Sequence, residues 1–350
     1  MRSFADLDRV LGRVPSRVVT LLSTVDVGRG SEALYQDQLP GVLGELANRA
    51  RVASITMSSA IEGVVVDDRS RAERIIRGDV TTLRTRGEQE LAGYRDAIDH
   101  LFREDWRPLS VGLVLHLHRL LFAHTKAAGG RFKTEDNLVV DRAPDGTTTV
   151  RFRPVAAAET EFHVRELVER YREAIADARH HPVLLAGLFV LDLTVIHPFE
   201  DGNGRVARAI TNALLADAGY GVVRYVSLEQ LIAESADAYY QALLDSTRGW
   251  RDDKVDPWPW LEYFVGVLAE AYRIFARRAA AERPAGSKQE RVRDYVLRCA
   301  PSIFRVADVR AALPGVSDQT IRLVLGELRR EGEVAPDGVG RAAVWRRVPR

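Results

Sequence analysis

The longest apolar run of the chain, VLLAGLFVLDLTVI at residues 183–196, limits the fold more than any other segment. It is too short to span a bilayer and it contains Asp192, so we expect a helix that other protein segments bury on all sides. Pro198 follows almost directly and ends that helix, because the residue before a proline avoids the helical conformation. The run therefore predicts a helical core around which the rest of the chain packs.

Helical patterns dominate the rest of the chain, and one short region differs. Helical spacing or helix-forming composition covers residues 41–63, 86–103, 110–124, 157–179, 205–218, 227–247 and 258–282. Val139–Val140 and Thr147–Phe152 are β-prone runs on either side of a turn signal, Ala143-Pro144-Asp145-Gly146. We therefore predict a mainly α fold that contains one β-hairpin.

Composition and charge exclude several classes of protein. The 350 residues are 46% hydrophobic, which is more than one small core needs and favours two or three domains. The net charge of +1 gives the whole molecule no strong attraction to nucleic acid or membrane. The single cysteine, Cys299, excludes an internal disulfide framework, and the N-terminus lacks the apolar core of a signal peptide. We expect a cytoplasmic protein that has no membrane partner.

The segment HPFEDGNGRVAR, residues 197–208, collects the groups that phosphoryl-type transfer needs. His197 can accept a proton near neutral pH, and Asp201 is a hard oxygen ligand suited to Mg²⁺. The glycines on either side of Asn203 permit a turn whose amides lead into a helix N-terminus, which binds anions. Arg205 and Arg208 are three residues apart, so both lie near one face of that helix. Each feature alone is an ordinary turn or surface charge, but together they supply a base, a metal ligand and an anion site.

This segment resembles the signature of the Fic family, HPFx(D/E)GNGRxxR, at every specified position. The resemblance implies a helical bundle that transfers a nucleotide monophosphate, AMP from ATP in particular, to a protein hydroxyl. It implies that His197 deprotonates that hydroxyl, that Asp201 holds Mg²⁺ and that Phe199 anchors the loop. The resemblance also implies phosphate-binding roles for Gly202, Asn203 and Gly204 at the α-phosphate, and for Arg205 and Arg208 at the β- and γ-phosphates.

A second short pattern lies upstream, at the end of the helix expected over residues 41–63. SSAIEG, residues 58–63, fits the family's inhibitory pattern (S/T)xxxE(G/N), with Gly63 as a C-terminal cap. By this resemblance Ser58 and Glu62 form an inhibitory motif in which Glu62 pairs with Arg208. A carboxylate on a phosphate-binding arginine competes directly with ATP, so the resemblance implies self-inhibition.

The expected hairpin lies where the family carries a flap, upstream of the signature. The segment Gly130–Lys133 precedes it, and its strands lie near Leu138–Val140 and Val150–Phe152. An exposed strand edge can align a target peptide by main-chain hydrogen bonds, which would hold a target hydroxyl near His197. The family usually has Pro-Pro after this strand, whereas this chain has Arg153-Pro154-Val155.

The C-terminal segment, residues 288–350, differs from the rest in charge and pattern. It holds thirteen Lys or Arg and eight Asp or Glu, whereas the preceding residues carry a small negative excess. A polar stretch at 282–287 separates it as a linker. Two short helices at 306–313 and 318–331, a cap at Ser317 and a strand-like run at 342–347 resemble a winged helix-turn-helix. The candidate contacts to DNA or to a protein partner are Arg322, Arg329 and Arg330.

Together these patterns predict three parts and one leading function. The parts are an N-terminal helical region at 1–100 with an inhibitory helix at about 45–63, a Fic catalytic domain at 101–283 and a winged helix-turn-helix at 288–350. The leading function is a self-inhibited protein adenylyltransferase that uses ATP and Mg²⁺ and modifies a target protein or itself.

Two alternatives to this function stay open. One is a DNA-binding regulator whose Fic domain senses nucleotide, and the other is a Fic enzyme that removes AMP or transfers another phosphate-linked group. Because winged helices also serve as protein-docking modules, a protein partner and a homodimer stay open beside DNA.

Overall fold

The computed structural model describes residues 2–38, 40–103, 105–142, 147–250, 256–281, 287–313, 315–337 and 344–348. The chain divides into two compact units, one made of Met1–Arg29 and Leu46–Phe275 and the other of Gly30–Glu45 and Ala276–Arg350. The signature at 197–208 and the pattern at 58–63 both belong to the first unit.

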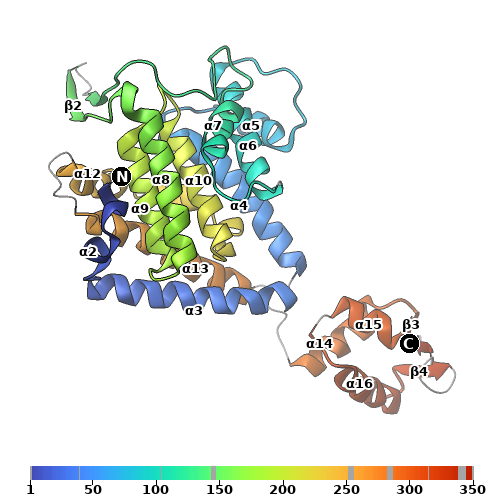
Figure 1. The fold of residues 1–350 in the computed structure, drawn as a ribbon. Helices are drawn as coiled ribbons and strands as arrows, with labels where there is room; N and C mark the ends of the chain where they lie inside the picture. Colours follow the sequence, from blue (N-terminus) through green and yellow to red (C-terminus); the bar gives the residue numbers. More distant parts are fainter. Residues whose placement is uncertain are drawn as a thin grey trace. The chain divides into compact units, whose positions relative to one another are not determined.

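Helix α9, Pro182–Ile196, forms the centre of the first unit, and all but two of its residues are buried. It is flanked by α8, Ala157–Asp177, and α10, Asn203–Asp217, which run beside it in Figure 1 in green and yellow. Its one charged side chain, Asp192, accepts a hydrogen bond from the hydroxyl of Ser3 at 2.7 Å. The predicted buried helix is therefore confirmed, and Ser3 compensates the buried carboxyl group.

Further helices belong wholly or in part to the first unit. They are α1 (Arg2–Ala5), α2 (Leu7–Leu11), α3 (Ser16–Gln38), α4 (Pro40–Ile61), α5 (Arg69–Arg77), α6 (Arg86–Arg103), α7 (Val111–Leu121), the 3₁₀ helix η1 (Gly221–Arg224), α11 (Leu228–Glu234), α12 (Ala236–Thr247) and α13 (Trp258–Ala281). Helix α6 runs across residue 100, so the start of the predicted catalytic domain and most of the predicted N-terminal region lie in the first unit, whereas residues 30–45 belong to the second.

Two helical segments differ from the prediction. The helix predicted over 227–247 is broken into α11 and α12 at Ser235, whose φ of −128° and ψ of 34° are not helical. Helix α3 had no predicted counterpart, because Gly28 and Gly30 lower its helix propensity. A Cβ at Gly28 would lie 2.5 Å from ring atoms of Tyr272, so glycine there permits close packing of α3 on α13.

The predicted hairpin is present as strands β1, Val139–Arg142, and β2, Thr148–Phe152. The strands are antiparallel, with Val140 opposite Val150 and an irregular register beside Val139. The turn signal at 143–146 lies outside the described residues.

The second unit contains a small α/β arrangement near the C-terminus. Its elements are α14 (Lys288–Asp294), a π-helical turn (Tyr295–Cys299), β3 (Ile303–Arg305), α15 (Val306–Ala312), α16 (Asp318–Arg330), β4 (Val334–Asp337) and β5 (Val344–Arg347). The strands form an antiparallel sheet in the order β3-β5-β4. The two predicted helices and the cap at Ser317 are confirmed, and β5 lies within the predicted strand-like run at 342–347, whereas α14 and β3 were not predicted. The linker residues 282–286 and the residues Pro314, Gly338 and Gly340 lie outside the described residues.

Within the described part of the chain, no helix combines the length and the apolar character that crossing a membrane requires.

Candidate active site

The loop between α9 and α10 begins at His197, which is the C-cap of α9. Its φ of 51° places a non-glycine residue in the left-handed region, while its amide still donates to the carbonyl of Leu193. Phe199 is fully buried beyond Pro198, as the sequence predicted. Asn203 fixes the loop, because its side chain accepts from the amide of Phe199 and donates to its carbonyl, both at 2.8 Å. The loop thus presents His197 from a rigid base.

Two glycines shape the N-terminus of α10. Gly202 is the N-cap with a φ of 80°, and a Cβ there would lie 2.7 Å from Leu121. A Cβ at Gly204 would overlap the carboxylate of Glu62, so this position leaves room for an acidic group against the helix. The first amides of α10 have no partner within the helix and lie at its positive end, which suits an anion.

Arg208, on the second turn of α10, is held by the end of α4. Its Nε donates to the Ser58 hydroxyl and its terminal nitrogen donates to the Ser58 carbonyl and to Glu62 Oε1, each at 2.9 Å. The Arg208 side chain is 4% exposed, and that of Glu62 is 34% exposed. Burial acts to lower the pKa of Arg208, but the charge and hydrogen bond of Glu62, together with the nearby Tyr239 and Tyr94, raise that pKa overall. The residues predicted to pair across 146 positions of sequence do meet here.

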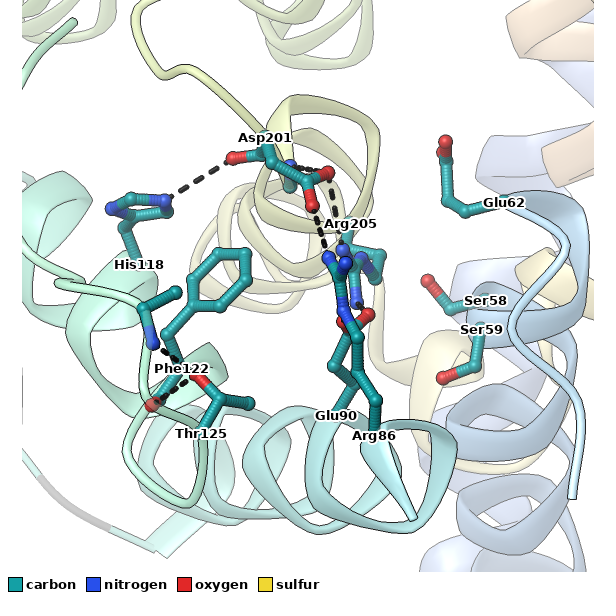
Figure 2. A network of polar contacts seen from close by, with 12 residues as sticks. Ser58, Ser59, Glu62, Arg86, Glu90, His118, Phe122, Thr125, Asp201 and Arg205 are labelled. Carbon is teal, nitrogen blue, oxygen red and sulfur yellow. Dashed lines mark hydrogen bonds and ion pairs between the residues drawn. The ribbon is translucent and has the colours of Figure 1, made fainter.

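Asp201 lies in a different network, drawn in Figure 2. Its Oδ1 accepts from the amide of Gly202 at 2.6 Å and faces Arg205 at 3.4 Å, and its Oδ2 accepts from Arg86 at 2.9 Å. Both arginines also bind the buried carboxylate of Glu90. Arg205 is 1% exposed and packs over the Phe122 ring, so its guanidinium braces Asp201 from inside the protein.

His118 on α7 holds the backbone of the loop, and sequence reasoning missed it. Its Nδ1 accepts from the amide of Gly130 at 2.9 Å, so Nε2 carries the proton and donates to the carbonyl of Asp201 at 3.2 Å. The ring stacks on Phe199 with centroids 3.8 Å apart. Burial lowers the pKa of His118 to about 4, which keeps this neutral tautomer in place near neutral pH. Figure 2 shows His118 on the side of Asp201 opposite Arg86.

His197 is also neutral near physiological pH. Burial and, to a smaller extent, the nearby charge of Lys133 lower its pKa to about 4, although the Thr194 carbonyl acts in the opposite direction. Lys133 is buried, and its ammonium donates to Asn137 at 2.9 Å and to the carbonyl of Ile196 at 3.2 Å. Burial lowers the pKa of Lys133 to about 8. A neutral imidazole is the form that can accept a proton.

A pocket connects His197 and Arg208 with an apolar recess. Its polar wall contains Glu62, His197, Asn203, Gly204 and Arg208. The rest of the lining comes from the hairpin, from Thr194 and from α12, namely Val139, Phe152, Tyr239, Tyr240, Leu243, Leu244 and Thr247. A charged end and an apolar end in one pocket match the two halves of a nucleotide.

The missed residues gave weak signals. Arg86 and Glu90 form an i,i+4 pair, which is common on any exposed helix, and nothing nearby in sequence links them to Asp201. His118 lies on the apolar face of α7, where the sequence pattern indicates only that a histidine packs in the core.

Comparison with known proteins agrees with this geometry. The model of the Fic/DOC family matches residues 108–215, which include the whole signature. Residues 108–215 form a Fic domain. It is 32% identical over 108 residues to the protein adenylyltransferase Fic of Drosophila ananassae, a match that covers 31% of this chain and 20% of that protein. The chain thus matches about a fifth of that relative's length.

Two solved structures share the Fic fold. A Fic family protein from Desulfovibrio desulfuricans G20 is similar with a TM-score of 0.63 and 18% identity, over 97% of this chain and 98% of that one. A Fic domain containing signaling protein from Bacteroides thetaiotaomicron is similar with a TM-score of 0.60 and 19% identity, over 78% of this chain and 100% of that one. At these identities the likeness establishes the mainly helical fold.

Proposed function

We propose that the protein is an adenylyltransferase that moves AMP from ATP to a protein hydroxyl and is held inactive by its own Glu62. The observation that carries this proposal is the Glu62–Arg208 pair, because it lies in the same pocket as His197 and the N-terminus of α10. A base, an anion site and a masked arginine in one pocket fit nucleotidyl transfer under self-inhibition. The relative named a protein adenylyltransferase supports the choice of AMP.

In the productive complex the phosphates lie along the start of α10. The amides of Asn203 and Gly204 receive the α-phosphate, while Gly202, whose amide donates to Asp201, shapes the turn; Arg208 receives the γ-phosphate once Glu62 has moved. The Arg205 side chain is buried, so it acts near the β-phosphate mainly by holding the Asp201 carboxylate in position. The apolar recess between the hairpin and α12 takes the base and sugar.

His197 acts as the general base. Its neutral imidazole takes the proton of the target hydroxyl, whose oxygen forms a bond to the α-phosphorus as the bond to the pyrophosphate oxygen breaks. The products are the AMP-modified protein, pyrophosphate and the proton first held by His197. The αL backbone of His197 and the clamp that Asn203 forms around Phe199 keep the ring in position.

Asp201 fits a site for one Mg²⁺ ion. It is a single, half-exposed carboxylate at the edge of the anion site, and no group of three or more His, Cys, Asp or Glu side chains suited to a metal occurs among the described residues. Mg²⁺ commonly binds one or two carboxylates and completes its shell with water and phosphate oxygens, so this donor set is sufficient. The cation would neutralise phosphate charge that Asp201 alone would repel.

Target recognition is assigned to two other parts. The strand edge of the β1–β2 hairpin aligns a target peptide near His197, because Val139 and Phe152 of the hairpin already line the pocket. The C-terminal residues 288–350, proposed as a winged helix-turn-helix, dock a partner through α16, where Arg322, Arg329 and Arg330 are exposed. We favour a protein partner over DNA, because Glu327 and Glu331 lie at the same helix end.

The test is transfer of label from α-³²P-ATP by a Glu62→Gly variant with Mg²⁺, followed by mass spectrometry of the modified protein. We expect AMP on a hydroxyl side chain of the enzyme itself or of an added target, and loss of label in Asp201→Ala or in excess EDTA. Each other nucleoside triphosphate serves as a comparison. Binding of ATP with no label on protein would favour the nucleotide-sensing regulator, and a mass shift other than AMP would favour transfer of a different group.

A further inference from the structure

The Asp201 carboxylate is already neutralised by the protein. Oδ1 accepts from the Gly202 amide and faces the guanidinium of Arg205, while Oδ2 accepts from Arg86 at 2.9 Å. The oxygen that is not tied to the loop backbone is therefore occupied by a cationic side chain. A metal ion can take that oxygen only after Arg86 leaves it.

The two arginines on Asp201 differ in their freedom to move. Arg205 is buried and fixed between Glu90 and Phe122, so it stays with the core. Arg86 is the first residue of α6, and its side chain is 73% exposed. Its Nε binds Glu90, whose side chain is 1% exposed and is shared with Arg205. Arg86 can therefore swing into solvent while Glu90 keeps its bond to Arg205.

We propose that Arg86 is a lock on the metal site, a positioned cation that substitutes for Mg²⁺ at Asp201 until the metal–nucleotide complex displaces it. The inference rests on the proposed function. It adds a second case, beside Glu62, in which a side chain of the protein occupies the place of a ligand group. Glu62 pairs with Arg208, the arginine proposed to bind phosphate, and Arg86 pairs with Asp201, the carboxylate proposed to bind metal. Binding of the metal–nucleotide complex then requires both ion pairs to break, whereas nucleotide without metal requires only the Glu62–Arg208 pair to break.

The lock predicts a definite change in how metal and nucleotide binding depend on each other. Without metal, loss of Arg86 leaves the Asp201 carboxylate with one fewer positive partner. Its negative charge then repels the triphosphate more strongly, so nucleotide binds more weakly. With Mg²⁺, the ion no longer competes with a guanidinium, so nucleotide binds more tightly. The ratio of the dissociation constant in EDTA to that in Mg²⁺ should therefore grow, by about two- to fivefold for an exposed ion pair.

The experiment measures both dissociation constants for a hydrolysis-resistant ATP analogue by calorimetry, with the full chain carrying Glu62→Gly so that Arg208 is open. The variants are Arg86→Gln and the matched control Arg84→Gln, which removes an equal charge from an exposed residue two positions earlier. Asp201→Asn reports the part of the ratio that depends on the metal carboxylate. We expect a larger ratio in Arg86→Gln, an unchanged ratio in Arg84→Gln and a ratio near one in Asp201→Asn.

Three results would overturn the lock, and they identify which proposal has failed. An unchanged ratio in Arg86→Gln, with a collapse in Asp201→Asn, removes the lock and keeps the metal site. Weaker binding by Arg86→Gln than by the parent, both measured in Mg²⁺, means that Arg86 holds phosphate instead of blocking metal. A ratio of one in the parent itself removes the metal site at Asp201, and the lock falls with it.

Discussion

Burial governs the chemistry of His197, because its imidazole is placed where a charged ring is poorly solvated. The lowered pKa of about 4 means that the ring is neutral, and so able to accept a proton, at any pH well above that value. A histidine of ordinary pKa, about 6.5, would be mostly protonated and inactive as a base at pH 5.5. If His197 is the base, the transfer rate should therefore fall on the acid side only at a pH well below the usual pKa range of histidine.

The first prediction is a flat pH profile. For Glu62→Gly we expect kcat/KM, which reports the free enzyme, to change by no more than about twofold between pH 7.5 and 5.5. The measurement is initial transfer rate at low ATP, with circular dichroism at each pH to show that the protein stays folded. A limb centred at the usual histidine pKa would contradict the effect of burial or the assignment of the base.

The second prediction separates chemistry from binding at the same residue. His197→Ala should lower transfer by about 10²- to 10⁴-fold, because a general base is lost. Affinity for the ATP analogue should stay near that of the parent, because the phosphates are held by α10 and Arg208. The matched control is His124→Ala, a histidine outside the pocket that pairs with Asp96. Transfer at the parent rate in His197→Ala would remove the proposed mechanism.

Residue identities were easier to predict than residue environments. The signature located His197, Asp201 and Arg208, and the structure brings two of them, His197 and Arg208, to one pocket. It did not indicate that Arg205 is buried, because a spacing of three places two arginines on one helix face without saying which one meets an acid. That outcome depends on Glu90, which lies 115 positions earlier in the chain.

At the scale of elements, the Glu62–Arg208 pair that we propose to be inhibitory depends on how neighbouring helices of the first unit hold α4. Arg51 of α4 forms a bidentate pair with Asp99 of α6 at 2.6 and 2.7 Å and also donates to the carbonyl of Ile76. These contacts fix the helix that ends with Glu62. The carboxylate therefore reaches Arg208 from a held helix end, with no ordering of a flexible segment required.

The third prediction is activation by Glu62→Gly. The change frees Arg208 to bind the γ-phosphate, and a charge-assisted hydrogen bond of about 1.5–3 kcal/mol corresponds to a rise of about 10- to 100-fold in transfer. The double change with Arg208→Ala should lose most of this gain, because both residues act on one interaction. Rates measured at saturating ATP that are equal in wild type and Glu62→Gly would remove Glu62 from regulation.

Elements with a strong local pattern were predicted, and elements that depend on distant partners were not. The uniform apolar run of α9 and the two β-prone runs of the hairpin each carry their own signal. Helix α3 contains Gly28, which is explained only by Tyr272 on a helix far along the chain. Strand β3 is short and its only partner in the sheet is β5, which lies about forty residues later, so its sequence alone gave no clear pattern.

At the scale of the whole molecule, the C-terminal part has a core of its own. Its buried residues run from Val292 to Val334, and Trp345 packs against them. The capping box at Ser287 and Glu290 begins this part with its own helix signal. The sequence predicted a boundary here from the polar stretch at 282–287 and from the change of charge.

The last prediction is that residues 288–350 are separable and select a partner without taking part in transfer. A truncation that ends near Ala285 keeps α13 to its end at Ala281 and keeps every residue of the pocket, so self-modification of the Glu62→Gly form should stay within about twofold of the full chain. Binding of the partner by the truncated protein should be lost instead.

If that partner is DNA, affinity of the full chain should fall with salt at a log–log slope of about −0.9 for each phosphate neutralised, with Arg322, Arg329 and Arg330 as contacts. If it is a protein, as we favour, no duplex should shift at moderate ionic strength. A truncation that is folded by circular dichroism and yet inactive would mean that the C-terminal part helps to build the site, because each residue assigned to the chemistry would still be present.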